Sequence, residues 1–75
     1  METNYRTRFQ AEYHDLKTRV DKLSAMLRSY EQGSLDFVPT CPVTLLYEQL
    51  EVMRHYKLLL EERAEIEEIE LGEER

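Results

Sequence analysis

The sequence predicts an all-α protein, an antiparallel two-helix hairpin that oligomerises into a helical bundle. Two long segments with helical apolar spacing flank a short region that contains Gly33 and both prolines, and 75 residues are enough for one domain. We assign residues 1–75 to this domain, with a first helix at about 5–32, a loop at about 33–41, a second helix at about 42–70 and an acidic tail.

The first helix is predicted by apolar residues whose spacing alternates between four and three positions. Thr3 and Asn4 are both suited to cap its start, and Gly33 can adopt the positive φ that often follows a helix end. The apolar seam consists of Phe9, Tyr13, Leu16, Val20, Leu23, Leu27 and Tyr30. Four of these residues are assigned to the core or to an oligomer interface: Leu16, Val20, Leu23 and Leu27.

Pro42 suits the first turn of the second helix, because the N–H group that proline lacks would have no partner there. The helix carries two apolar stripes. One stripe is Leu46, Leu50, Met53, Leu60 and Ala64. The other is offset by about 100° and is Leu45, Val52, Tyr56, Leu59 and Ile66. The residues assigned to the core or an oligomer interface are Leu46, Leu50, Met53 and Leu60. A face this wide predicts a homo-oligomer, because one partner helix cannot cover it.

The antiparallel arrangement is favoured by helices of similar length and a short connection. A turn near Phe37 places residue 14 opposite residue 60, and it places Arg6 and Arg8 beside the glutamate-rich end of the second helix. The alternative is a parallel coiled-coil dimer through the first helix, with Val20 and Leu27 at one core position. That alternative leaves the second helix without a role.

Charge and composition exclude several classes of function. The net charge is −6, and the last fifteen residues contain eight glutamates, so we expect no general binding to nucleic acid. The acidic end is either a solvated tail or a mimic of nucleic acid. A single cysteine, Cys41, permits neither an internal disulfide nor a cysteine zinc site. The sequence has no membrane-spanning run and no secretory signal, so we expect a cytoplasmic location.

The residues that could support catalysis are few. His14 and His55 fall at different levels of the predicted hairpin, and no lysine, arginine or histidine lies within six residues of Cys41 to activate it. Adjacent glutamates near the end of the second helix point in different directions, so they do not form an acid and base pair. We therefore expect no enzymatic activity, no metal site and no cofactor.

Aromatic residues beside cations indicate more about function than the few residues that could support catalysis. Tyr13, His14 and Lys17 lie within about one turn of the first helix, and Tyr56 and Arg63 occur in the second. A flat ring can stack on a nucleobase while a nearby cation pairs with a phosphate. These five residues are the candidate ligand-binding residues, although Tyr13 and Tyr56 would also fit at the rim of a core.

Part of the sequence resembles a known family. The second helix contains Gln49, Leu50, Met53, Tyr56, Leu60 and Arg63, and the first contains Arg8, Glu12, Leu16, Lys22 and Leu23. Together these residues resemble a small phage and prophage helical-hairpin family, named after a protein of a crAss-like gut phage and largely of unknown function. The resemblance runs from about residue 5 to residue 66, and the loop at 36–42 departs from the family.

This resemblance implies a phage accessory protein and no particular reaction. The first functional hypothesis is a binding protein that counters host defence, either by sequestering a nucleotide signal or by occluding a host protein. It would act in the host cytoplasm, with itself as an oligomeric partner. The alternative is a structural or assembly adaptor that only mediates contacts between proteins.

Overall fold

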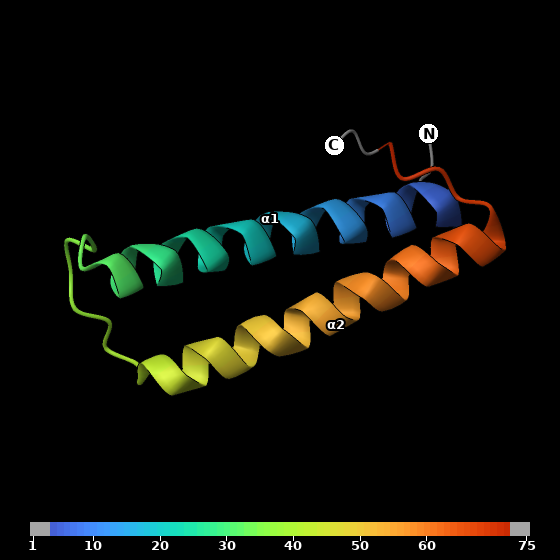
Figure 1. Ribbon diagram of the computed structural model, residues 1–75. Helices are drawn as coiled ribbons and strands as arrows, with labels where there is room; N and C mark the ends of the chain where they lie inside the picture. Colours follow the sequence, from blue (N-terminus) through green and yellow to red (C-terminus); the bar gives the residue numbers. More distant parts are fainter. Residues whose placement is uncertain (1–3, 73–75) are drawn as a thin grey trace.

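The computed structural model describes residues 4–72 and consists of two antiparallel helices (Figure 1). Helix α1 is Tyr5–Gln32 and helix α2 is Val43–Glu67. The molecule measures 44 × 25 × 22 Å, which is the shape of a hairpin of two long rods. No strand occurs among the described residues, so the predicted all-α hairpin is confirmed.

Both ends of α1 form as the sequence predicts. The side chain of Asn4 accepts a hydrogen bond of 2.8 Å from the backbone N–H of Thr7, which satisfies one of the free donors of the first turn. Thr3, the other candidate cap, lies outside the described residues. Gly33 has φ of 75°, and the backbone N–H of Ser34 returns to the carbonyl of Ser29 at 2.9 Å. Glycine reaches this left-handed conformation without the steric cost that a β-carbon would add.

The ends of α2 lie within three residues of the predicted ones. Pro42 precedes the first turn as the N-cap, with an extended ψ of 137°, so the helix begins at Val43. The helix ends at Glu67, earlier than the predicted residue 70, because Glu68 adopts φ of 58°. The N–H of Ile69 then bonds to the carbonyl of Ala64 at 2.8 Å, as in a Schellman motif.

The early end of α2 has a packing reason. The turn at Glu68 brings Ile69 into the core, where it is buried, instead of leaving it on an extended helix. The returning chain is held by α1, because Arg6 Nη1 donates to the carbonyl of Glu68 at 2.8 Å and the Gln10 amide donates to the carbonyl of Glu70. The first part of the predicted acidic tail is therefore attached to α1, and residues 73–75 lie outside the described residues.

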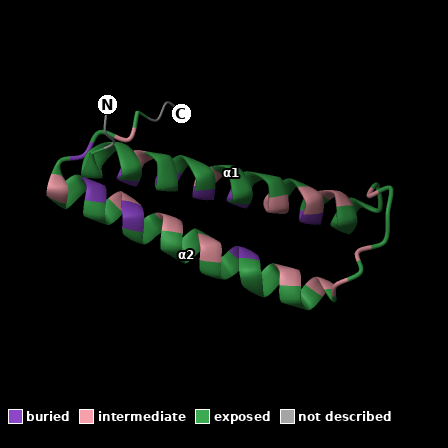
Figure 2. Ribbon diagram, turned by 180° about the vertical axis from the view of Figure 1, so that it is seen from behind, coloured by how far each residue is buried: buried purple, intermediate pink, exposed green. Residues whose placement is uncertain are grey.

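The core lies between the two helices along one face of each (Figure 2). Its buried residues are Phe9, Tyr13, Leu16, Val20, Leu27, Leu50, Leu60, Ala64 and Ile69. The remaining predicted core residues, Leu23, Leu46 and Met53, are half-buried and pack against this cluster. The predicted seam of α1 is interrupted at its end, because Tyr30 is 45% exposed where the helices approach the loop.

The hairpin is packed more tightly at its terminal end than at its loop end. Figures 1 and 2 show α1 and α2 closest beside the chain termini and farther apart toward the loop at 33–42. The buried residues follow the same trend, since the half near the loop contains Val20, Leu27 and Leu50, whereas the other six buried residues lie in the terminal half. Tyr13 donates to Glu61 at 2.7 Å, which confirms the predicted register of residue 14 opposite residue 60.

Candidate functional site

Tyr13, one of the predicted ligand-binding residues, belongs to the core. It is 3% exposed, and its hydroxyl donates to a carboxylate oxygen of Glu61. The ammonium of Lys57 lies 5.8 Å from the centre of the Tyr13 ring and 3.0 Å from Glu61. The hydrogen bond from Tyr13 is the main reason that the pKa of the Glu61 carboxyl is lowered; burial opposes this effect, and Lys57 adds to it. This group joins the two helices and leaves little of the Tyr13 ring open to a ligand.

His14 and Lys17 follow Tyr13 on α1. The His14 ring makes an edge contact with the Tyr13 ring, at 5.6 Å between ring centres. The Lys17 ammonium pairs with Asp21 one turn later at 3.5 Å, and this exposed pair contributes at most about 1 kcal/mol. Lys17 therefore remains accessible to solvent beside the Tyr13 group.

Arg63 lies at a different contact between the helices. Its Nη2 donates to the Tyr5 hydroxyl at 2.8 Å, its Nε lies 3.5 Å from Glu67, and its guanidinium covers the Phe9 ring at 4.9 Å. The Tyr5 hydroxyl in turn donates to Glu67 at 2.8 Å. The hydrogen bond from Arg63 to Tyr5 is the main reason that the pKa of Arg63 is raised.

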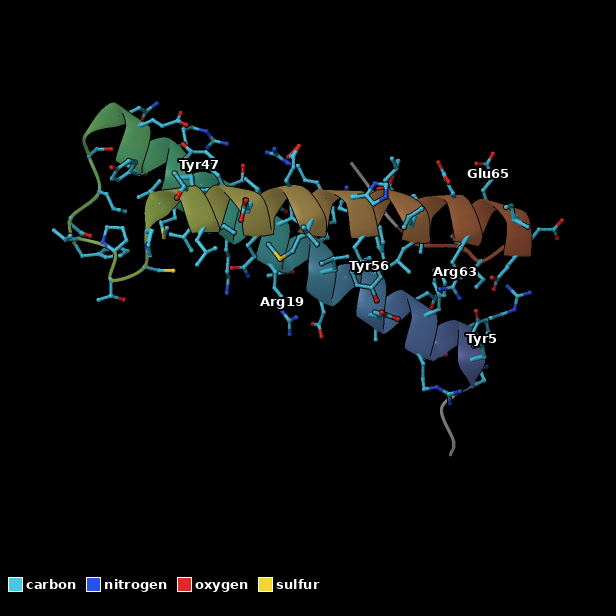
Figure 3. All side chains as sticks on the ribbon, turned by 90° about the horizontal axis from the view of Figure 1, so that it is seen from below. Tyr5, Arg19, Tyr47, Tyr56, Arg63 and Glu65 are labelled. Atoms are coloured by element: carbon cyan, nitrogen blue, oxygen red, sulfur yellow. The ribbon has the colours of Figure 1, made fainter. Side chains whose placement is uncertain are left out.

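The structure therefore divides the five predicted residues between two sides of the hairpin. In Figure 3, Tyr56 and Arg63 extend from the edge of α2 that lies over α1, on the side where Tyr5 and Arg19 are also seen. Tyr13 instead packs with Lys57 and Glu61, which occupy other positions around α2. The residues that the sequence grouped as one candidate site do not form one pocket.

A groove on the Arg19 side brings two cations together with apolar residues. Its volume is about 320 Å³, and we call it the basic groove: Arg19, Lys22, Leu23 and Met26 of α1 with Gln49 and Met53 of α2. Leu23, Met26 and Met53 pack on the core, whereas Arg19 and Lys22 are exposed. Within residues 4–72, neither cation makes an ion pair or hydrogen bond through its side chain. The groove thus joins two unpaired positive charges to a floor of adaptable methionines.

A second groove of about 320 Å³, nearer the loop and on the other side, is less suited to an anion. Its arginines, Arg28 and Arg54, are accompanied by Glu31 and Glu51. Arg54 already contacts the hydroxyl of Ser24 at 3.4 Å. The hydroxyl of Tyr47, also in this lining, donates to Glu31, and this hydrogen bond is the main cause of the raised pKa of Tyr47. The opposite charges in this lining balance one another.

Sequence reasoning missed most of the basic groove because its residues come from two helices. Nearness along the chain drew attention to Tyr13 and Lys17, whereas the groove is formed by residues opposite one another. The predicted register contained the necessary signal, since it places Lys22 close to Met53 and Met26 close to Gln49.

Other chemistry finds little support in the part of the chain that the structure describes. Residues 4–72 contain no cluster of three or more histidine, cysteine, aspartate or glutamate residues that could hold a metal ion. Cys41 lies half-buried in the loop. Neither α1 nor α2 is long and apolar enough to cross a membrane.

Comparison with known proteins gives one match. A family model described as Sequestin matches residues 3–66, which include nearly all of both helices and the whole loop. No curated protein and no solved structure matches the chain.

Proposed function

The chain belongs to the Sequestin family, and on this basis we propose that it is a sequestering binding protein without enzymatic activity. The family name supports capture of a partner molecule as the activity. A protein that acts by capture needs a surface complementary to its target and no reacting groups, and the basic groove is such a surface. The observation that supports this proposal most directly is the pair of unpaired cations, Arg19 and Lys22, above an apolar floor.

The proposed ligand is a small anion that carries a flat ring, as a nucleotide signal does. A guanidinium and an ammonium can bind phosphate oxygens, and methionine side chains adapt to a planar base. Tyr56, which is 41% exposed, lies one turn beyond Met53 and offers a further ring. A protein with a net charge of −6 repels anions in general, so affinity for such a ligand must come from a local cluster of cations.

The biological setting of this proposal rests on the resemblance of the two helices to a phage and prophage family. In this setting the protein is a phage product that acts in the host cytoplasm, counters a host defence and functions as a homo-oligomer. It needs no cofactor, and it uses neither a membrane nor nucleic acid as a partner.

Binding assays on charge variants test the groove. We would titrate the protein with a labelled cyclic dinucleotide and, separately, with a labelled cyclic mononucleotide, and measure fluorescence anisotropy. The Arg19→Glu and Lys22→Glu variants are expected to weaken binding at least about tenfold each, because each replaces an attraction to phosphate by a repulsion. Lys17→Glu is the matched control, since it changes the net charge equally but lies beside Tyr13 on α1.

The charge variants distinguish binding in the basic groove from binding beside Tyr13. If Lys17→Glu abolishes binding and the groove variants do not, the ligand binds beside Tyr13 and the basic groove is not the site. If neither class of nucleotide binds the unaltered protein, the nucleotide proposal is wrong. The second candidate, an adaptor that occludes or joins proteins, then becomes the better account, and the exposed apolar residues of α2 favour it.

A further inference from the structure

The outer face of α2 carries four large apolar residues that the hairpin leaves exposed. Leu45, Val52, Leu59 and Ile66 have 52%, 69%, 43% and 80% of their surface exposed, and we call them the outer stripe. Leu59 follows the buried Leu50 by nine residues, about 180° around the helix at 100° per residue. The outer stripe thus lies outside the core face of α2, and α1 leaves it exposed.

The spacing of the outer stripe indicates what kind of partner would cover it. Its members are separated by seven residues each, from Leu45 to Ile66. A strict seven-residue repeat supplies one of the two core positions of a left-handed coiled coil, so the stripe can stay in contact with another long helix that runs beside α2 over its whole length. The three intervals of seven residues between these four layers span about 31 Å at 1.5 Å per residue, and α2 itself is a helix long enough to cover this length.

Polar pairs occupy the levels between the apolar layers. The pairs are Glu48 with Gln49, His55 with Tyr56, and Glu62 with Arg63. In each pair, the first residue lies on one flank of the outer stripe and the second residue lies on the other flank. These flanking residues determine which direction a second α2 could take, because they meet across the interface in a different combination for each direction.

A parallel pair of α2 helices brings opposite charges together. A two-fold axis along the helices places the first flank of one copy against the second flank of the other, so Glu62 meets Arg63 of the second copy twice. The antiparallel register that aligns all four layers places like flanks together, and there Glu48 meets Glu62 of the second copy. The parallel arrangement is favoured because it replaces two repulsions by two attractions.

We propose that the outer stripe binds a second copy of this chain, through α2 packed in parallel on α2 with equivalent residues meeting at each layer. Arg63 can take part while it binds Tyr5 and Glu67, because its side chain is 50% exposed and a guanidinium has five N–H donors. This inference deepens the homo-oligomer of the proposed function. The basic groove borders the outer stripe, because Gln49 lines the groove and also flanks the stripe, but the two tests below measure association without any ligand.

Sedimentation equilibrium tests the surface. The unaltered protein is expected to be a dimer at micromolar concentration. Val52→Glu combined with Ile66→Glu is expected to weaken association at least about 100-fold while circular dichroism remains helical, since every substitution counts twice in a symmetric dimer. Val38→Glu is the control, because Val38 is 86% exposed in the loop and should leave association unchanged. A monomeric unaltered protein, or a dimer that tolerates the double substitution, overturns the proposal.

Disulfide trapping tests the direction. With Cys41→Ser as background, Ile66→Cys is expected to form a covalent dimer under mild oxidation, because parallel helices bring the two copies of position 66 together. In the antiparallel register those positions are about 31 Å apart, and a mixture of Leu45→Cys and Ile66→Cys chains would cross-link instead. Cross-linking only in the mixture overturns the parallel arrangement, and it does so without bearing on ligand binding in the basic groove.

Discussion

Leu60→Ala is expected to remove a large part of the stability of the hairpin. Leu60 is 1% exposed and belongs to the core between α1 and α2. Truncating a fully buried leucine costs about 2–5 kcal/mol, from lost burial and from the cavity that remains. A domain of 75 residues has a free energy of unfolding of roughly 4–11 kcal/mol at 0.05–0.15 kcal/mol per residue. The substitution should therefore remove at least about a fifth of the stability, and all of it if the hairpin is near the lower end of this range.

Urea unfolding followed by circular dichroism measures this loss, with all variants at one protein concentration. Leu58→Ala is the matched control, because it deletes the same atoms from the same helix where the side chain is 49% exposed. It should cost less than about 1 kcal/mol. Equal losses at positions 58 and 60, or a loss below about 1 kcal/mol at Leu60, would show that this face of α2 is not the core.

Three further predictions concern local interactions. Gly33→Ala should lower the free energy of unfolding, measured in urea, by about 1 kcal/mol because position 33 has a positive φ. An added β-carbon meets nothing within 4 Å, so no steric clash adds to this cost. Asn4→Ala should cost about 1 kcal/mol, and Asn4→Ser should restore most of it. The pKa of the Glu61 carboxyl is lower in the folded protein than its usual value of 4.5, so this group stabilises the fold at pH values above 4.5. The contribution is lost as the pH falls through the lower pKa of the folded protein. The gap in melting temperature between the unaltered protein and Tyr13→Phe should therefore narrow below about pH 4.5, and a constant gap would contradict the assignment.

The helices could be predicted closely because their signals are local. A cap at Asn4, a glycine at position 33 and an even apolar spacing together defined α1 from Tyr5 to Gln32. The end of α2 could not be predicted in this way, because glutamates continue past residue 67 and a helix is compatible with all of them. It is burial of Ile69 against α1, a contact with residues distant in sequence, that makes the turn at Glu68 favourable.

The candidate site was harder to predict than the fold, for a related reason. The sequence predicted that Tyr13 is available to bind a ligand. In the structure, the register of the hairpin places Glu61 and Lys57 beside Tyr13, and its hydroxyl donates to Glu61. Arg63 looked like a free cation, but Tyr5 and Glu67 bind it. Whether a polar side chain is free depends on what the opposite helix presents, so the composition of one helix is a poor guide to the site.

The tight packing beside the chain termini has a consequence for the order in which the hairpin forms and opens. Tyr47 and Glu31, near the loop, are separated by 16 positions in sequence, whereas Tyr5 and Glu67 at the terminal end are separated by 62. Closing the longer segment costs about 1.2 kcal/mol more in chain entropy, at 0.6 kcal/mol for each doubling. The strongest packing is thus placed where closure is most costly, and the loop half, which contains the basic groove, is held by fewer buried contacts. Amide hydrogens of the loop half should therefore exchange with solvent faster than those around Leu60. The basic groove can then widen to admit a ligand while the terminal half keeps the molecule folded.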